Sequence, residues 1–111
     1  MKVLYHPDRD DIELSSVLYA LSDPIRLYLV SQIRKYGENP CNYFEVPVAK
    51  STLSHHIRTL RESGVIFTRS QGTQRLVSVR AEDLDYRFPG VLDAVLQAYE
   101  ASGQGFPTRE D

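Results

Sequence analysis

The sequence predicts one small domain that is mainly α-helical and carries a single β-hairpin. Four segments place apolar residues at the three- and four-residue spacing of one helix face. In residues 65–80 the hydrophobic period changes from about 3.6 to 2, which is typical of β-strands. The chain has 111 residues, enough for one modest core and too few for a second full domain.

Two helices are predicted in the first third of the chain. The first is expected to start at an aspartate near position 10, which can cap it. The second is expected to begin at Pro24, because Asp23 can cap it and proline needs no backbone partner at the first helical position. It should run to about Lys35, since Gly37 is suited to end a helix.

The third predicted helix begins at Lys50 and ends at Gly64. Residues 38–49 before it follow no clear pattern, because Pro40 and Pro47 restrict any helix there to a short piece. From Lys50 onward the apolar residues return to helical spacing, and the opposite face is polar.

A hairpin is predicted after this helix. Residues 65–69 and 75–80 are two β-prone segments. Residues 70–74 are expected to join them as a loop of about five residues, in which Gly72 can take a positive φ.

The remaining sequence predicts a last helix and the limits of the domain. An apolar stripe starts at residue 91, directly after a proline–glycine pair. We therefore expect an N-terminal arm over residues 1–10, the domain over residues 11–101, and a flexible polar tail over residues 102–111.

The net charge of −2 hides a strongly basic segment. Residues 1–49 carry five basic and seven acidic side chains, and residues 81–111 carry two and seven. Residues 50–80 carry six basic side chains against one acidic side chain, a local charge of +5. Because a polyanion responds to local charge more than to the total, this segment is the candidate surface for nucleic acid.

The composition excludes several other classes of protein. No run of about 18 apolar residues is present, which excludes a transmembrane helix in this sequence. The first residues become acidic where a signal peptide would need an apolar core. One cysteine, Cys41, can form neither an internal disulfide nor a four-cysteine zinc site, and this count fits a reducing cytoplasm.

Short hydrogen-bonding side chains and basic side chains gather on the helix from Lys50 and at the hairpin tip. A helix fits the major groove of DNA, and a hairpin beside it can lie along the phosphates. We expect Lys50, Arg69 and Arg75 to bind phosphates, and Thr52, Ser54 and His55 to select sequence. The candidate DNA-binding residues are Lys50, Ser51, Thr52, Ser54, His55, Arg58, Arg69, Gln71, Thr73, Gln74 and Arg75.

Two motifs resemble those of a known family. The stretch KSTLSHHIRTLRESGVI and the Gly72 hairpin after it resemble the winged helix-turn-helix of the ArsR/SmtB family of bacterial repressors. The stretch ALSDPIRLYLV resembles that family's second helix, where an Ala/Leu-x-Asp/Asn-Pro-x-Arg pattern recurs. The likeness covers about residues 10–100. It implies a winged helix-turn-helix protein that represses transcription by covering promoter DNA. In the family, an inducer lowers the affinity for DNA, and the sequence does not identify that inducer.

The resemblance also implies a homodimer that binds a near-palindromic operator. In the family, the first and last helices pair across the two-fold axis. Two apolar stripes on so small a chain agree with that arrangement, although either stripe could instead pack on its own domain. The candidate dimer residues are Leu14, Val17, Leu18, Val91, Leu92, Val95, Leu96 and Tyr99.

The metal sites of the family are not matched. Cys41 has no cysteine partner nearby, and the last helix offers Asp93 and Glu100 but no histidine. We therefore predict no metal and no cofactor. His55 and His56 are adjacent, so they point about 100° apart on a helix. We expect His55 to face DNA and His56 to be a partly buried packing or hydrogen-bonding residue.

Three alternatives accompany this interpretation. No catalytic constellation is present in the sequence, so we predict that the protein is not an enzyme. A winged-helix module that binds another protein is the rival function, although such a module would not need a basic recognition face. Cys41 is expected to be a small buried residue, with a redox switch as the alternative.

Overall fold

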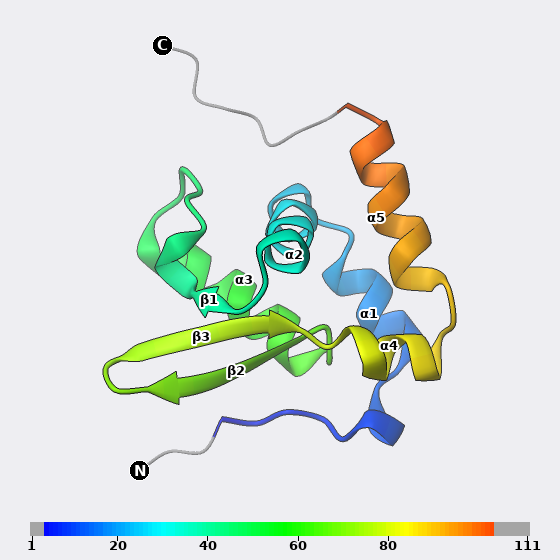
Figure 1. The fold of residues 1–111 in the computed structure, drawn as a ribbon, viewed down its shortest axis with the longest axis horizontal. Helices are drawn as coiled ribbons and strands as arrows, with labels where there is room; N and C mark the ends of the chain where they lie inside the picture. Colours follow the sequence, from blue (N-terminus) through cyan, green and yellow to red (C-terminus); the bar gives the residue numbers. More distant parts are fainter. Residues whose placement is uncertain (1–3, 104–111) are drawn as a thin grey trace.

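The computed structural model describes residues 4–103 and has the winged helix-turn-helix arrangement that the sequence predicts (Figure 1). The described chain forms five α-helices, two short 3-10 helices and a three-stranded antiparallel sheet of order β1-β3-β2. The α-helices are α1 (Leu14–Ala20), α2 (Pro24–Tyr36), α3 (Lys50–Glu62), α4 (Ala81–Arg87) and α5 (Val91–Ala101). The strands are β1 (Asn39–Pro40), β2 (Ile66–Gln71) and β3 (Gln74–Val79), and the 3-10 helices are Arg9–Asp11 and Cys41–Tyr43.

Helix α2 lies at the centre of the fold and begins where the sequence predicts. The Asp23 carboxylate accepts hydrogen bonds from the backbone N–H groups of Ile25 and Arg26, at 2.9 and 3.1 Å. These two bonds satisfy donors that the helix itself leaves unpaired. Gly37 follows the helix with a φ of +80°. Leu29, Val30 and Ile33 of α2 are fully buried in the core.

The first helix begins later than predicted. Residues 9–11 form a 3-10 turn, Ile12 is extended, and α1 starts only at Leu14. The reason is tertiary packing. Ile12 is 1% exposed, and a Cβ built on Gly64 would lie 2.7 Å from its Cγ1 atom. An extended backbone directs this side chain into the core, where only a glycine leaves room for it.

The unassigned segment between α2 and α3 contains no α-helix. Asn39 and Pro40 pair with Val77 and Leu76 of β3, and a single 3-10 turn follows. Phe44 is 4% exposed and anchors the segment in the core. Proline interrupts helical hydrogen bonding, so the segment joins the sheet edge instead of forming a full helix.

The hairpin has a shorter loop than predicted. Gln71 pairs with Gln74, so the loop consists of Gly72 and Thr73 rather than five residues. Gly72 has a φ of +61°, and no other residue type has a positive φ in the described chain. Glycine at the first loop position is typical of a type II′ turn, whose twist matches that of the paired strands.

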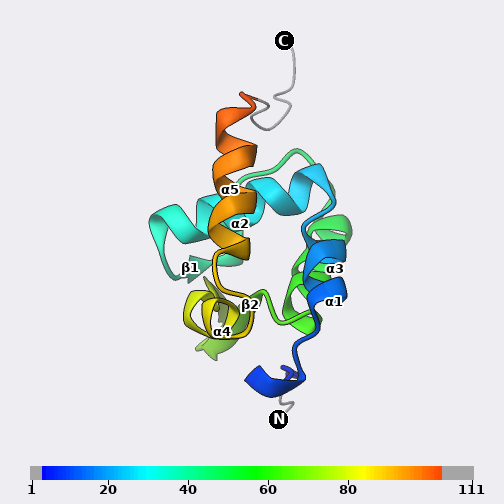
Figure 2. The same ribbon diagram turned by 90° about the vertical axis from the view of Figure 1, so that its right-hand side faces the viewer.

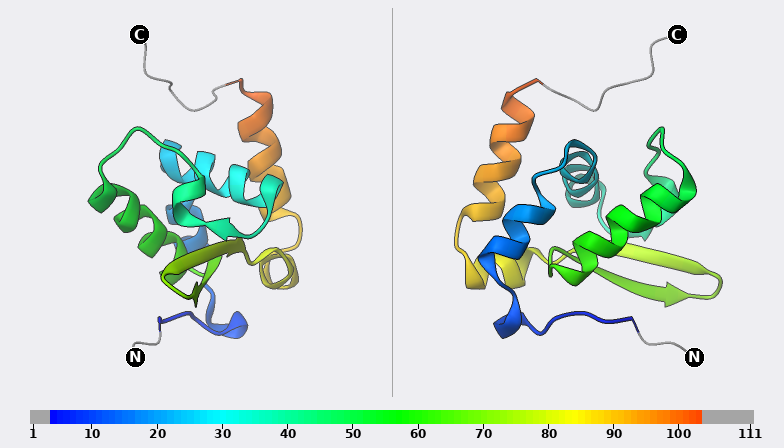
Figure 3. Two further views of the ribbon diagram at one scale, coloured as in Figure 1. Left: turned by 60° about the vertical axis from the view of Figure 1, so that its left-hand side comes forward. Right: turned by 180° about the vertical axis from the view of Figure 1, so that it is seen from behind.

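The packing of the helices separates two ends of the molecule. Helix α1 packs against α3, α5 packs against α2, and α4 lies beside the base of α5 (Figure 2). Helix α3 and the hairpin project at one end, whereas α5 lies at the other end (Figure 3, right). None of the helices in residues 4–103 has the length and apolar character needed to cross a membrane. The predicted tail lies outside these residues, apart from Ser102 and Gly103.

Candidate nucleic-acid interface

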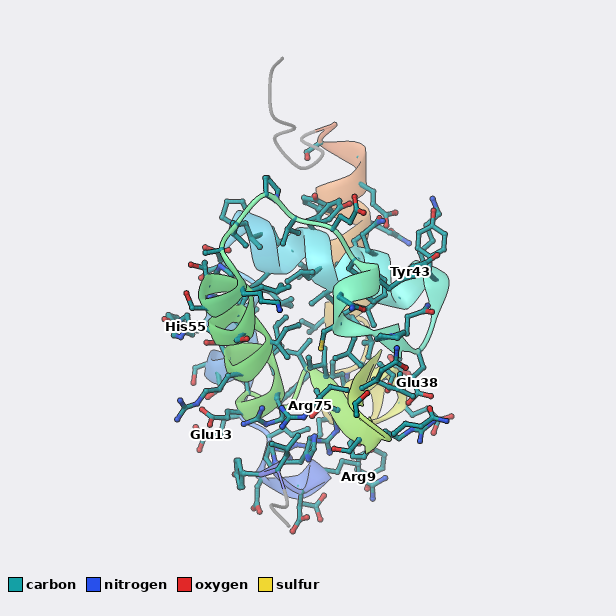
Figure 4. The ribbon with its side chains drawn as sticks, turned by 90° about the vertical axis from the view of Figure 1, so that its left-hand side faces the viewer. Arg9, Glu13, Glu38, Tyr43, His55 and Arg75 are labelled. Atoms are coloured by element: carbon teal, nitrogen blue, oxygen red, sulfur yellow. The ribbon has the colours of Figure 1, made fainter. Side chains whose placement is uncertain are left out.

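The predicted recognition surface is exposed as one face of α3 and the hairpin tip. Ile57 and Leu60 of α3 are buried and hold the helix on the core, whereas its polar side faces outward. Figure 4 shows His55 on this outer side, with Arg75 between α3 and the hairpin. All of the predicted residues are exposed, namely Lys50, Ser51, Thr52, Ser54, His55, Arg58, Arg69, Gln71, Thr73, Gln74 and Arg75.

The start of α3 offers backbone donors. Ala49 occupies the cap position, and its side chain makes no capping hydrogen bond. The first N–H groups of an α-helix have no partner within the helix, and the helix dipole adds positive potential there. Because Lys50 is also exposed at this position, the start of α3 is chemically suited to a phosphate oxygen.

The two adjacent histidines of α3 point in different directions, as predicted. His55 is exposed, whereas His56 is 7% exposed. The His56 Nδ1 atom lies 3.2 Å from the Nη1 atom of Arg26. Burial lowers the pKa of His56 below the usual value for histidine. His56 therefore belongs to the interior support of α3, and His55 to its outer surface.

The two hairpin arginines that are predicted to bind phosphates lie on opposite faces of the sheet. Arg75 pairs with Ser70, and Arg69 pairs with Leu76. Paired residues share a face, and successive residues of a strand alternate between faces. Arg75 therefore shares the face of the buried Val77, the side on which the helices pack. Arg69 points from the other face, a difference that only the strand register decides.

Arg69 is also held by an acidic partner. Its Nε and Nη2 atoms donate to the two carboxylate oxygens of Glu38, at 2.8 and 3.0 Å. This two-pronged bond lowers the pKa of Glu38. Glu38 lies directly before β1, so the sheet brings it to Arg69 from 31 residues away in the sequence. No local sequence pattern pairs these two residues, and sequence analysis missed Glu38 for that reason.

The basic segment is therefore partly neutralised within the protein. Arg58 donates to Glu62 at 3.1 Å, and Arg80 bonds Asp83 at 3.0 Å. Lys50 and Arg75 form no ion pair with any residue between positions 4 and 103. These two exposed cations flank the polar face of α3.

The apolar stripes of α1 and α5 are only partly at the surface. Leu14 and Leu18 are 42% and 46% exposed on successive turns of α1. Val91, Val95 and Tyr99 of α5 are half-buried. Each of these five side chains keeps part of its surface exposed.

Three predicted dimer residues need correction. Val17, Leu92 and Leu96 are 2%, 7% and 3% exposed in the core of their own chain. The i, i+3, i+4 face of a helix spans a broad arc, so one edge of the stripe packs inward and the other faces outward.

The structure places no metal-binding cluster among the residues it describes. Within positions 4–103, no three histidine, cysteine or acidic side chains are grouped closely enough to hold a metal ion. Cys41 is half-buried, and burial raises the pKa of its thiol, which disfavours the reactive thiolate. His6 accepts a hydrogen bond from the backbone N–H of Thr68 at 3.0 Å, so its ring has a structural partner.

Known proteins with similar sequences are transcriptional regulators. The chain is 30% identical over 94 residues to the uncharacterised HTH-type transcriptional regulator YceK of Bacillus subtilis, covering 78% of this chain and 89% of that protein. It is 33% identical over 75 residues to the arsenical resistance operon repressor of Staphylococcus xylosus, covering 67% of this chain and 72% of that protein. No family model matches the sequence.

Solved structures share the fold. The transcriptional repressor BigR of Xylella fastidiosa superposes with a TM-score of 0.55 and 29% identity, covering 74% of this chain and 97% of that chain. An ArsR-like transcriptional regulator of Rhodococcus sp. RHA1 gives a TM-score of 0.59 at 19% identity, covering 82% and 89%. On its fold and these sequence matches, the chain belongs to the ArsR family of winged helix-turn-helix transcriptional regulators.

Proposed function

We propose that this protein is a transcriptional repressor that binds a near-palindromic operator in double-stranded DNA as a homodimer. The observation that carries the proposal is the exposed polar face at the start of α3, together with Lys50 and Arg75, two exposed cations that have no ion-pair partner within residues 4–103. In this arrangement α3 enters the major groove, and the hairpin lies along the adjacent backbone. Such a protein acts in the bacterial cytoplasm, where its DNA is.

The contacts divide into affinity and sequence choice. Lys50 and Arg75 bind phosphates, each adding about 0.9 to the salt slope of the logarithm of the binding constant. Arg69 contributes less, because binding a phosphate requires it to give up Glu38. Thr52, Ser54 and His55 select bases from the first turns of α3.

The homodimer would pair the exposed sides of α1 and α5. On these helices, Leu14 and Leu18 are exposed, and Val91, Val95 and Tyr99 are half-buried. Two such subunits present two copies of α3 to successive major grooves, about 34–36 Å apart on a near-palindrome. The relative from Staphylococcus xylosus is named as a repressor, which supports repression as the outcome of binding.

The test compares binding to the protein's own upstream DNA with binding to a random duplex across a salt series. We expect tighter binding to the upstream DNA and a steep salt dependence. Equal, weak binding to both duplexes would contradict specific recognition of the upstream DNA. Absence of binding even at low salt would overturn the DNA proposal and favour a winged-helix module that binds protein.

Two variants separate the proposed roles of the side chains. Arg75→Ala should weaken binding to every duplex alike and lower the salt slope by about 0.9, because one phosphate contact is lost. His55→Ala should instead change the ranking among operator variants, with a lost base contact costing about 1–3 kcal/mol. Arg69→Ala is the matched control. It should lower the salt slope by less than Arg75→Ala does, because Arg69 is already bonded to Glu38. Uniform loss in both Arg75→Ala and His55→Ala would contradict the division.

A further inference from the structure

A buried cation joins the three helices of the DNA-binding half. Arg26 of α2 is 6% exposed. Its Nε atom donates to the carbonyl oxygen of Ala20 at 2.7 Å, and its Nη2 atom donates to that of Tyr19 at 3.4 Å. The guanidinium therefore supplies hydrogen-bond donors to the carbonyl oxygens at the end of α1. Its Nη1 atom lies 3.2 Å from Nδ1 of His56 on α3. No carboxylate forms an ion pair with this guanidinium in the described chain.

The bond between Arg26 and His56 requires one particular protonation state. A guanidinium only donates hydrogen bonds, so Nδ1 of His56 must accept. An imidazole nitrogen accepts only when it carries no proton, and a neutral ring then holds its proton on Nε2. The contact as observed therefore exists only while His56 is neutral.

A second partner lies close to the same nitrogen. The Oδ2 atom of Asp23 is 3.9 Å from Nδ1 of His56. A protonated Nδ1 would donate to this carboxylate and could no longer accept from Arg26. One atom thus has two partners of opposite charge, and each partner requires the opposite protonation state. Asp23 also caps the start of α2. A hydrogen bond from His56 to Asp23 would therefore connect α3 to the residue that caps α2.

We propose that Arg26 and His56 are positioning residues for the DNA-reading face of α3, and that protonation of His56 exchanges its partner from Arg26 to Asp23 and weakens DNA binding. This inference rests on the proposed function. His56 directly follows Ser54 and His55, and it lies one helical turn after Thr52. A shift of the His56 ring would therefore move the turn of α3 that carries the side chains proposed to select sequence.

The charges around His56 decide the sign of the effect. Burial, Arg26 and the adjacent His55 disfavour the protonated ring, whereas Asp23 favours it. From α1, the ring of Tyr19 lies beside the same cation, with the Arg26 guanidinium 5.3 Å from the ring centre. Burial is the largest of these effects, so the pKa of His56 lies below 6.5. The bond to Arg26 is therefore complete near neutral pH and is lost as the pH falls through that lowered pKa.

The first experiment measures DNA affinity from pH 7.5 to 5 in a His55→Gln background, because a protonated His55 would itself attract phosphates. We expect affinity to fall by up to about tenfold per pH unit below the pKa of His56, as for one linked proton. His56→Gln supplies an amide oxygen that can accept from Arg26 but does not titrate, so it should keep the neutral-pH affinity and flatten the profile. Near- and far-ultraviolet circular dichroism confirm that this variant is folded.

Two further variants sharpen the result. Asp23→Asn keeps a side chain able to cap α2 and removes the charge that attracts protonated His56, so the midpoint should move to lower pH. In His6→Gln the fall in affinity at the His56 midpoint should persist, because His6 bonds Thr68 of β2 and not Arg26 or Asp23. The proposal is overturned if DNA affinity does not change with pH while His56 is present. It is also overturned if the same pH dependence remains in His56→Gln.

A nuclear magnetic resonance titration without DNA separates this inference from the proposed function. At pH 7.5 the ¹⁵N shifts of His56 should place the ring proton on Nε2, and the amide signals of residues 52–55 should titrate with the His56 midpoint. A proton on Nδ1 at pH 7.5, or amide signals that do not change at the His56 midpoint, overturns the inference. If these signals behave as expected but no DNA binds at any pH, the proposed function fails and the coupling of His56 to α3 is retained.

Discussion

Single residues decide how closely the chain can pack on itself, and Gly64 is the clearest case. Its φ is +92°, and an added Cβ would lie 2.7 Å from Cγ1 of Ile12, which is buried. Two separate penalties therefore apply to any larger residue at this position. One is the left-handed backbone, and the other is a clash between the end of α3 and the segment before α1.

We predict that Gly64→Ala destabilises the protein more than Gly37→Ala. Gly37 has a similar φ of +80°, but a Cβ there meets nothing within 4 Å. Gly37→Ala should cost about 1–2 kcal/mol from backbone strain alone. Gly64→Ala should cost a further 1–3 kcal/mol or so from overpacking against Ile12. Urea denaturation measures both free energies of unfolding, and equal losses would contradict the packing argument.

At the scale of elements, the N-terminal arm covers the free edge of the hairpin, as Figure 1 shows. The strand order β1-β3-β2 makes β2 an edge strand. The carbonyl of Tyr5 accepts from Arg61, and His6 accepts from Thr68 at the middle of β2. The His6 ring stacks on Phe67 with centroids 4.5 Å apart. The bond to His6 occupies the backbone N–H of Thr68, which would otherwise be free to pair with another chain.

This arm should make stability depend on pH. Burial lowers the pKa of His6, and Arg61 and Arg80 act in the same direction. The folded state therefore binds fewer protons than the unfolded state between the lowered pKa and 6.5. The contribution of His6 is complete above 6.5 and falls as the pH drops through this window.

The measurement is urea denaturation at pH 7.5 and pH 5.5. His6→Gln should reduce the loss of stability between these two pH values, because glutamine can accept from Thr68 and does not titrate. His55→Gln is the control, since His55 is exposed and bonds no strand. His56 also has a lowered pKa, so the informative quantity is the difference from wild type. An unchanged pH dependence in His6→Gln would show that the arm does not bind through its neutral ring.

At the scale of the whole molecule, the proposed DNA-reading surface and the proposed dimer surface lie on different elements. The reading surface is α3 and the hairpin, at the end away from α5 (Figure 3). Leu14 and Leu18 are exposed on α1, and the outer edge of the α5 stripe is half-buried. A dimer formed through α1 and α5 would leave both copies of α3 free to contact DNA.

We predict that Leu18→Glu converts the proposed homodimer to a folded monomer with weaker operator binding. Leu18 is 46% exposed, so a charged side chain there costs the single chain little, whereas burying it in a dimer is unfavourable. Tyr43→Glu is the matched control, because Tyr43 is 53% exposed on another part of the surface. Sedimentation equilibrium measures the mass. A dimeric Leu18→Glu, or a monomeric wild type, would show that this surface is not the interface.

Local chemistry accounts for the parts of the fold that sequence predicts well. The start of α2 follows from Asp23 and Pro24, and the exposed and buried sides of α3 follow from its helical period. The same period separates His55 from His56. Each of these features depends on residues within about one or two helical turns, so the neighbouring sequence contains the information.

Long-range packing accounts for the parts of the fold that the local sequence does not predict. Strand β1 exists because residues 39 and 40 reach the edge of β3, and α1 starts late because Ile12 is needed in the core beside Gly64. The inward packing of Val17, Leu92 and Leu96 likewise depends on which neighbour each helix meets.

By itself, the sequence determined a mainly helical domain with one hairpin, a basic segment with polar side chains on one helix face, and the family to which that pattern belongs. Only the tertiary structure decided which of those charges are free. The strand register set Arg69 and Arg75 on opposite faces, and the sheet edge brought Glu38 to Arg69. The fold likewise buried Arg26 against His56. Helical and strand periods are local properties, whereas an ion pair or a buried hydrogen bond depends on where distant segments of the chain meet.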